Sequence, residues 1–301
     1  MNIRRIRSIE EYHEFRGFKR PDHPLLSVVD IGGSNELSPE NIVLDFYSIS
    51  LKRGLDGIFK YGQQNYNFKE GIMFFLAPNQ VFSVGHNQEG TRAKPTGWML
   101  LIHPDFFWNT PLARNIHSYG FFDYAVSEAL VLLEKEETVV NNIVANIRNE
   151  YHSNIDKYSK QIIISQIESL LNYADRFYNR QFLTHEKENH HILERLEALL
   201  SAYFNESDLI NKGLPKVQFV AQKLNISPDY LSGMLRALTG QNTQQHIHEK
   251  LIEKAKEKLT STDLSVSEVA YQLGFEHLQS FSKLFKQKTG QSPIKFREGF
   301  N

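Results

Sequence analysis

The C-terminal part of the chain contains an internal repeat, and this repeat constrains the fold more than any other feature. The segment VQFVAQKLNI at Val217–Ile226 matches VSEVAYQLGF at Val266–Phe275 in its apolar positions, with an offset of 49 residues. Beyond this point the offset becomes 50. The pairs are then Leu231 with Phe281, Ser232 with Ser282, Leu235 with Phe285, Arg236 with Lys286, and Thr239-Gly240 with Thr289-Gly290. A repeat of this kind indicates two copies of one supersecondary unit.

Each copy has the layout of a helix-turn-helix. A first helix is predicted over Val217–Leu224 in one copy and over Ser265–Leu273 in the other. Asn225 and Gly274 follow these helices, and both residue types tolerate the positive φ that such a turn requires. The second helices are expected over Asp229–Leu238 and His277–Lys288, with their apolar residues turned inward.

A single helix is predicted to join the two copies. Thr243–Leu259 carries Ile247, Leu251, Ala255 and Leu259 at i, i+4 spacing. At roughly 1.5 Å per residue this segment forms a rod of about 25 Å. With its end turns, the rod could hold two recognition helices about 34 Å apart, which is one turn of DNA.

The residues of the second copy resemble the C-terminal signature of AraC/XylS-type transcription regulators. The residues that match the signature are Val269-Ala270, Gly274-Phe275, Ser280, Phe281, Lys283, Phe285-Lys286, Gly290, Ser292-Pro293 and Phe296-Arg297. The resemblance covers about Ile192–Asn301 and implies a double helix-turn-helix domain that binds double-stranded DNA. It also implies a cupin-like β-barrel in the N-terminal part, followed by dimerisation helices.

The outer face of the second recognition helix supplies the main candidates for DNA contacts. Phe281 and Phe285 are expected to point to the core. The remaining polar residues are His277, Gln279, Ser280, Ser282, Lys283 and Lys286. Gln can bond adenine in a bidentate way, and Lys can meet guanine or phosphate. The resemblance implies base contacts for Gln279, Ser282 and Lys283, and a backbone contact for Lys286.

The first copy offers fewer candidates, namely Asp229, Ser232 and Arg236. Gly233 stands where the family commonly has Arg or Lys, and Gly within a helix costs roughly 0.5–1 kcal/mol relative to Ala. Asp229 could accept a bond from cytosine or simply favour the helix dipole. We therefore expect weaker or more shape-dependent DNA recognition from this copy, with Arg236 contacting phosphate.

The charge of the chain divides between its two parts. The total is 34 basic against 35 acidic residues, a net charge of −1. Leu214–Asn301 holds 12 Lys and Arg against 8 Asp and Glu, which gives +4, and the remainder holds 22 against 27, which gives −5. A positive excess favours DNA binding through counterion release, although an excess of this size also occurs in domains that bind no DNA.

The first 135 residues are predicted to be rich in β-strands. Short segments with β-branched and aromatic residues alternate there with turn residues. The expected strands are Leu25–Ile31, Ile42–Leu51, Ile58–Tyr61, Gly71–Leu76, Gln80–Val84 and Trp98–His103. They suggest a compact barrel or sandwich, and the resemblance favours the barrel. Its aromatic residues could fill the core or surround a small effector.

Helical spacing replaces alternation after residue 135. Helices are predicted over Glu136–Tyr151 and Tyr158–Tyr178, and residues 136–183 are assigned to dimerisation. The apolar stripe of the second helix consists of Ile163, Ile167, Leu170, Leu171 and Ala174. Such a stripe can form a buried core or a dimer interface. Residues 184–191 are polar and are predicted to be a linker or a frayed helix end.

Composition and spacing exclude several classes of function. The chain has no cysteine, which excludes thiolate metal sites and cysteine nucleophiles. His86 and His103 stand alone in the strand-rich part, and His246 and His248 would point to different faces of a helix. We therefore expect no metal, no cofactor and no enzymatic activity. The apolar runs are shorter than the ~20 residues of a membrane helix, so a cytoplasmic protein without membrane contact is expected.

Together these features predict an α+β chain with a β-rich sensor domain at residues 1–135 and a DNA-binding domain at 192–301. The expected function is sequence-specific transcription regulation by a homodimer, with contact to RNA polymerase and response to a small effector left open. The alternative is a cupin-like sensor or enzyme whose helical tail mediates protein contacts.

Overall fold

The internal repeat lies in the second of two structural units. The computed structural model divides the chain into Met1–Thr184 and His185–Asn301, which we call the N-terminal and C-terminal units. The structure describes residues 3–33, 40–54, 60–61, 64–65, 71–84, 96–125, 128–152, 156–184, 186–205 and 209–299. The α+β prediction is confirmed, with sheets in the N-terminal unit and helices in the C-terminal unit.

The described strands of the N-terminal unit form open sheets. The strands are β1 (Ile3–Ile6), β2 (Leu26–Asp30), β3 (Glu40–Leu44), β4 (Tyr47–Arg53), β5 (Lys60–Tyr61), β6 (Gln64–Asn65), β7 (Ile72–Leu76), β8 (Val81–Val84), β9 (Thr96–Ile102) and β10 (Leu130–Val131). One antiparallel sheet has the order β10-β7-β4-β9-β2. A second has the order β1-β3-β8, with β1 parallel to β3, and β5 pairs with β6.

The closed barrel that was predicted is not the architecture of the described residues. β10 and β2 are the two edges of the five-stranded sheet, and no described strand joins them. The predicted strand at Ile42–Leu51 is in fact two strands, because the chain bends at Asp45 and Phe46. β3 pairs in the small sheet and β4 in the large one, so the chain changes sheets at this bend. Residues 58 and 59 of another expected strand lie outside the described residues.

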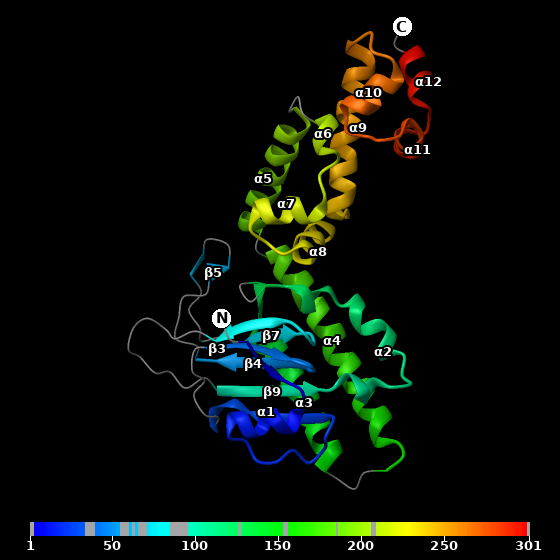
Figure 1. The fold of residues 1–301 in the computed structure, drawn as a ribbon. Coiled ribbons are helices and arrows are strands. Elements are labelled where there is room, and N and C mark those ends of the chain that lie inside the picture. Colours follow the sequence, from blue (N-terminus) through cyan, green and yellow to red (C-terminus); the bar gives the residue numbers. More distant parts are fainter. Residues whose placement is uncertain are drawn as a thin grey trace. The chain divides into compact units, whose positions relative to one another are not determined.

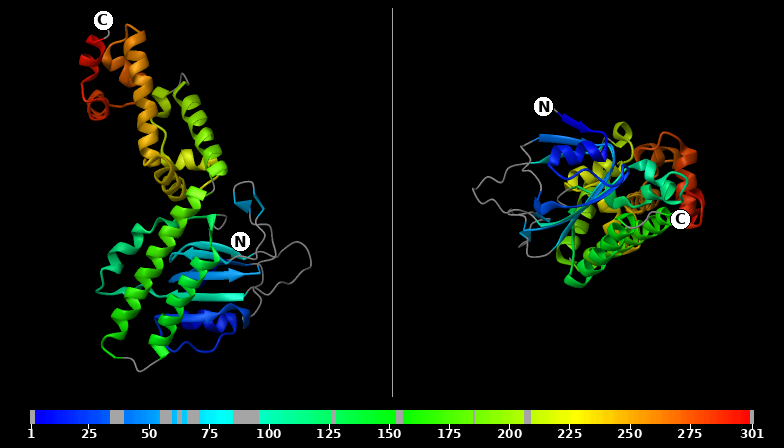
Figure 2. Two further views of the ribbon diagram at one scale, coloured as in Figure 1. Left: turned by 180° about the vertical axis from the view of Figure 1, so that it is seen from behind. Right: turned by 90° about the horizontal axis from the view of Figure 1, so that it is seen from below.

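Helices cover the five-stranded sheet. α3 (Glu134–His152) and α4 (Ser159–Thr184) lie side by side against it (Figure 1), and Figure 2 shows the same pair from behind. On this face, the Trp98 indole donates to the Asn141 side chain at 2.7 Å, and Arg53 pairs with Glu137. Shorter segments are α2 (Leu112–Asn115) and 3₁₀ turns at Ile31–Gly33, Pro104–Phe107, Ile116–Ser118 and Gly120–Asp123.

The opposite face of the five-stranded sheet packs against α1 (Ile9–Arg16) and the small sheet. The buried residues of this core are Ile6, Ile9, Tyr12, Val29, Ile42, Leu44, Phe46, Met99 and Leu101. The Tyr12 hydroxyl donates to the Met99 sulfur at 3.3 Å, which ties the helix to β9. Ser8 caps the start of α1 by accepting the Glu11 amide at 3.1 Å.

The apolar stripe of α4 is core and not an exposed interface. Ile163 is 4% exposed, and Ile167, Leu170, Leu171 and Ala174 are 0% exposed. These side chains are buried within the N-terminal unit, so they offer no surface to a second copy. The assignment of these five residues to dimerisation is therefore wrong, because the same spacing also serves burial against a helix and a sheet.

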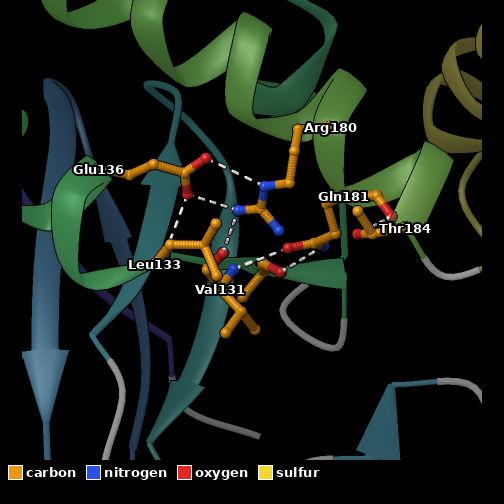
Figure 3. Close-up of polar contacts among 7 residues, drawn as sticks. Val131, Leu133, Glu136, Arg180, Gln181 and Thr184 are labelled. Atoms are coloured by element: carbon orange, nitrogen blue, oxygen red, sulfur yellow. Dashed lines mark hydrogen bonds and ion pairs between the residues drawn. The ribbon is translucent and has the colours of Figure 1, made fainter.

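The C-terminal end of α4 is fixed to β10 by side chains (Figure 3). The fully buried Gln181 accepts the Val131 amide at 2.8 Å and donates to the Ala129 carbonyl at 3.2 Å. Arg180 donates to both Glu136 carboxylate oxygens, at 3.0 and 2.5 Å, and to the Val131 carbonyl at 2.8 Å. The two-residue strand β10 thus depends on α4 for part of its hydrogen bonding.

The described residues of the C-terminal unit form helices α5 (Glu186–Asn205), α6 (Leu209–Lys212), α7 (Val217–Leu224), α8 (Pro228–Thr239), α9 (Thr243–Ser261), α10 (Val266–Gln272), α11 (Leu278–Thr289) and α12 (Pro293–Glu298). Residues 186–191 open α5 and do not form a separate linker, because Glu, Lys and His are compatible with a helix. His185 lies outside the described residues.

Helix α9 is the long axis of the C-terminal unit. It has 19 residues and is therefore about 28 Å long. Two helices that precede α9 in the chain, α5 and α8, contact it. Three helices that follow it, α10, α11 and α12, contact it as well (Figure 1). The predicted buried positions Ile247, Leu251, Ala255 and Leu259 are at most 1% exposed. In the described part of the chain, no helix is long and apolar enough to cross a membrane.

Candidate nucleic-acid interface

The first helix pair is formed by α7 and α8, and local signals fix its turn. α7 ends at Asn225, which has φ 60° and ψ 42°, the left-handed conformation predicted for this position. Ser227 caps α8 by accepting the Tyr230 amide at 3.3 Å, and Pro228 follows in the first turn, where a missing N–H is harmless. The turn between the helices is therefore encoded by Asn225, Ser227 and Pro228.

The second helix pair is formed by α10 and α11. Ser265 and Glu268 make a reciprocal capping box at the start of α10, and this hydrogen bonding lowers the pKa of the Glu268 carboxyl. Gly274 ends the pair's first helix with φ 84°. His277 precedes α11 as its N-cap residue, but its side chain makes no capping bond.

The two pairs repeat in three dimensions as they do in sequence. Each second helix is closed by a threonine whose hydroxyl donates to a carbonyl four residues earlier, Thr239 to Leu235 and Thr289 to Phe285, both at 2.8 Å. The following glycines, Gly240 and Gly290, have φ 75° and 79°. The matched apolar positions Val220, Ala221, Leu224, Leu231 and Leu235, and Val269, Ala270, Leu273, Phe281 and Phe285, are all buried.

The outer face of α11 is polar and accessible. Phe281 and Phe285 are 0% exposed and hold the helix on the core. The predicted contact residues His277, Gln279, Ser280, Lys283 and Lys286 are exposed, while Ser282 is half-buried. Neither Lys283 nor Lys286 forms an ion pair with any residue that the structure describes. Their ammonium groups are therefore available for phosphates or base edges.

The outer face of α8 is more limited. Asp229 and Arg236 are exposed, as predicted. Ser232 is half-buried, and its hydroxyl lies 2.9 Å from that of Thr243, which is fully buried at the start of α9. This hydrogen bond ties α8 to the connecting helix α9, so Ser232, predicted as a DNA contact, has a partner within the domain.

A close backbone contact positions the second helix pair. A Cβ on Gly274 would lie 3.0 Å from the Leu209 carbonyl oxygen and 3.0 Å from the Gly213 carbonyl carbon. The Tyr203 hydroxyl of α5 donates to the Gly213 carbonyl at 3.0 Å. Residues 209–213 therefore bridge α5 to the turn of the second pair, which explains why this turn carries glycine where the first carries asparagine.

Two further residues of α11, Gln287 and Lys288, are exposed in its last turns and were not among the predicted contacts. Burial and then the positive charge of Lys288 lower the pKa of His248 on α9. The sequence signal that could have identified Lys288 is the cluster of lysines at Lys283, Lys286 and Lys288. Lys288 matches neither the repeat nor the family signature.

The histidines of α9 make local contacts. The His246 ring lies 2.9 Å from the Thr239 hydroxyl, and His248 lies 2.8 Å from the Gln244 side chain. Burial lowers the pKa of His246, although Glu249 and Glu197 act in the opposite direction. Among the described residues, no group of three His, Cys, Asp or Glu side chains could hold a metal ion. His86 lies outside those residues.

Comparisons with known proteins match this part of the chain. A family model described as a helix-turn-helix domain matches residues 220–299. The Msm operon regulatory protein of Streptococcus mutans is 34% identical over 83 residues, covering 28% of this chain and 30% of that protein. The uncharacterized HTH-type transcriptional regulator YfiF of Bacillus subtilis is 32% identical over 139 residues, covering 46% of this chain and 41% of that protein.

A solved structure is also similar. The C-terminal domain of AraT, a response regulator from Geobacillus stearothermophilus, is 32% identical, and the match covers 36% of this chain and 84% of that chain with a TM-score of 0.32. The chain spans less than half the length of the two curated relatives above. The family resemblance of the C-terminal residues is confirmed, and in this unit the chain carries a helix-turn-helix domain of the AraC type.

Proposed function

We propose that this chain is a sequence-specific, DNA-binding transcription regulator in which α8 and α11 are recognition helices of two helix-turn-helix units. The observation that carries the proposal is the repeated helix pair, whose second copy presents Gln279, Lys283 and Lys286 on an exposed face. Relatives described as transcriptional regulators support it. Because α9 is about 28 Å long, it suits two recognition helices in successive major grooves.

The two recognition helices have different tasks in this proposal. Gln279 contacts adenine, Ser282 and Lys283 contact bases or phosphate, and Lys286 grips the backbone. His277 and Ser280 lie near these residues at the start of α11. In α8 only Arg236 is both cationic and exposed, so it binds phosphate, while Asp229 supports the helix N-terminus. Ser232 acts mainly through its bond to Thr243. Base recognition is therefore concentrated in α11.

Selection of binding sites from random duplexes, followed by anisotropy titrations, tests the proposal. Gln279→Ala should lose about 1–3 kcal/mol of discrimination at one base pair while binding to unrelated duplexes stays unchanged. Gln161→Ala, an exposed glutamine of α4, is the matched control and should bind as the parent protein does. If no sequence is enriched, or if Gln279→Ala leaves the selected sequence and its affinity unchanged, base recognition by α11 is refuted.

The proposal includes a homodimer, with the exposed side of α4 as its contact. Ile162 and Tyr173 are 43% and 36% exposed, and their spacing of about three helical turns places them on one side of α4. Ile162→Asp with Tyr173→Asp should give a folded monomer by light scattering, while Gln161→Ala should retain the dimer mass. An unchanged mass for the double variant would place the interface elsewhere.

The remaining parts of the proposal concern regulation. We include a small-molecule effector bound by the N-terminal unit, contact with RNA polymerase, and action in the cytoplasm without enzymatic activity. Transcription in vitro from a template carrying the selected site, with purified RNA polymerase, tests the regulatory step. A transcript level that does not respond to the protein would contradict it.

A further inference from the structure

The chain contacts the second helix pair before it forms the first. α5 has 20 residues, is therefore about 30 Å long, and contacts α9. The chain next forms α6, which contacts α10 of the second pair. It then returns to form α7 and α8, which lie at the opposite end of α9 from α10 (Figure 1). Residues 209–213, which we call the bridge, thus contact the second pair although the first pair follows them in sequence.

The bridge lies against the turn of the second helix pair, with backbone against backbone. A Cβ on Gly274 would lie 3.1 Å from the Cα atom of Gly213, as well as 3.0 Å from the Leu209 carbonyl oxygen. Gly213 has φ 70°, and its amide donates to the Leu209 carbonyl at 2.8 Å, which closes α6. Because backbone atoms cannot rotate away as a side chain can, the second pair cannot move toward the bridge without displacing it.

The Tyr203 side chain of α5 connects the bridge to the first helix pair. Its hydroxyl donates to the Gly213 carbonyl at 3.0 Å. Its ring lies edge-on to the Phe219 ring of α7, with the ring centres 5.4 Å apart. Tyr203 is only 9% exposed, so packing holds the side chain in this position. One residue therefore contacts both α7 and the bridge.

The bridge adds a connection between the helix pairs to the one that α9 provides. The added connection runs from α7 through Tyr203 and Gly213 to the turn at Gly274. Helices packed on one long helix can still slide or tilt by small amounts. A second connection, away from the axis of α9, opposes such movements, because the second pair is then held at two separate places.

We propose that the bridge fixes the second recognition helix relative to the first, and thereby makes the spacing of two DNA half-sites a determinant of specificity. Tyr203 and Gly274 are positioning residues, which act through the placement of α11. One base pair inserted between the half-sites moves one of them by about 3.4 Å and turns it by about a tenth of a turn. A fixed pair of helices cannot follow this change, whereas a loose pair can. The effect on DNA rests on the proposed function, but the fixed geometry is a property of the free chain.

Distances in the free protein test the bridge without DNA. The chain has no cysteine, so spin labels at Gln222→Cys on α7 and Gln287→Cys on α11, two exposed positions, report a single distance by pulsed electron paramagnetic resonance. We expect a narrow distance distribution for the otherwise unchanged chain and a broader or shifted one for Tyr203→Phe and for Gly274→Ala. Tyr271→Phe, at a tyrosine of α10 that is 48% exposed, is the matched control and should keep the narrow distribution.

Anisotropy titrations test the consequence for DNA. They use the selected site and two versions of it, with one base pair inserted or removed between its halves. The parent protein and Tyr271→Phe should lose about tenfold or more in affinity on either change. Tyr203→Phe and Gly274→Ala should lose about threefold or less, because a looser pair can adjust to both spacings. Each variant is titrated below its melting temperature, so unfolding does not contribute to the difference.

The outcomes separate the bridge from the proposed function. Tyr203→Phe retains the ring that packs on Phe219, so its effect isolates the hydrogen bond to Gly213. Distance distributions of both variants that equal the parent distribution would overturn the inference, and so would equal losses of affinity on changed spacing. If selection enriches no sequence, the proposed function fails, and the labels alone then decide whether the bridge fixes the two pairs.

Discussion

Lys52 shows how one residue can link stability to pH in this protein. Its surroundings hold the pKa of the ammonium at about 8, below its ordinary value of 10.5. The folded state therefore loses this proton at a lower pH than the unfolded state does. Below pH 8 the buried charge is a constant penalty, and between about pH 8 and 10.5 the contribution of Lys52 to stability improves as pH rises.

Replacement of Lys52 by methionine should remove this penalty. We expect Lys52→Met to have a higher free energy of unfolding than the parent at pH 7, because it buries a thioether of similar length in place of a cation. The advantage should shrink between pH 8 and 10.5. Urea unfolding of both proteins across this range measures the difference, in which the titration of other groups cancels. A difference that is constant with pH would contradict the assignment.

At the scale of elements, the turns of the two helix pairs reach a positive φ with different residues. Asn225 and Gly274 both have positive φ, but only Gly274 lies against the backbone of residues 209–213. A side chain at position 225 needs only the left-handed conformation, whereas one at position 274 would also need space. The sequence difference between the copies therefore follows from the bridge on the second copy.

Alanine substitutions should separate these two requirements. Asn225→Ala should destabilise the C-terminal unit by about 1–2 kcal/mol, and Asn225→Gly should be nearly neutral. Gly274→Ala should lower the free energy of unfolding more than Asn225→Ala does, because the new Cβ at position 274 would also displace the backbone at Leu209 and Gly213. Chemical unfolding of the three variants gives the comparison. If both alanine variants lose the same free energy of unfolding, residues 209–213 move aside without an energetic cost.

The network at the end of α4 allows a second element-scale prediction. Gln181→Leu should destabilise the N-terminal unit by about 2–4 kcal/mol, because it leaves the Val131 amide and the Ala129 carbonyl without their buried partner. Amide exchange at Val131 should accelerate strongly, as hydrogen-exchange measurements would detect. Asn179→Ala, an exposed change on the same helix, is the control. Unchanged exchange at Val131 would contradict the role of Gln181.

How much could be predicted depended on whether the signal was local. Ser227-Pro228 and the repeated Thr-Gly pairs mark helix ends within a few residues, so the helices of the C-terminal unit were predicted closely. The sheet was not, because pairing of β1 with β3 joins segments far apart in sequence. The α4 stripe indicated burial but not its partner. The bond between Ser232 and Thr243 crosses a turn and left no pattern in the sequence.

At the scale of the whole molecule, the net charge of −1 hides a division between the parts of the chain. Leu214–Asn301 has 12 − 8 = +4, and the remainder has 22 − 27 = −5. Lys283 and Lys286 of α11, which have no ion-pair partner among the described residues, add positive charge at the candidate interface. An acidic remainder limits binding to DNA of any sequence.

The proposed DNA contacts predict a defined dependence on salt. The logarithm of the association constant should fall linearly with the logarithm of salt concentration, because each phosphate contact releases counterions. Lys286→Ala should reduce the magnitude of this slope by about 1. Lys135→Ala, an exposed change on α3, should leave the slope unchanged. Anisotropy titrations between low and physiological salt measure it, and equal slopes for all three proteins would argue against a phosphate contact at Lys286.

Both helix pairs are attached to a single helix, α9. The rotation of one recognition helix relative to the other therefore cannot change in small steps. Each residue inserted into α9 would turn one recognition helix by about 100° relative to the other, and only about seven residues, two full turns, would restore its direction. One base pair added to the DNA turns its groove by only about a tenth of a turn. The spacing of bound sites should therefore be strict, and this protein should acquire new targets by changing side chains on α8 and α11 while the distance between them stays fixed.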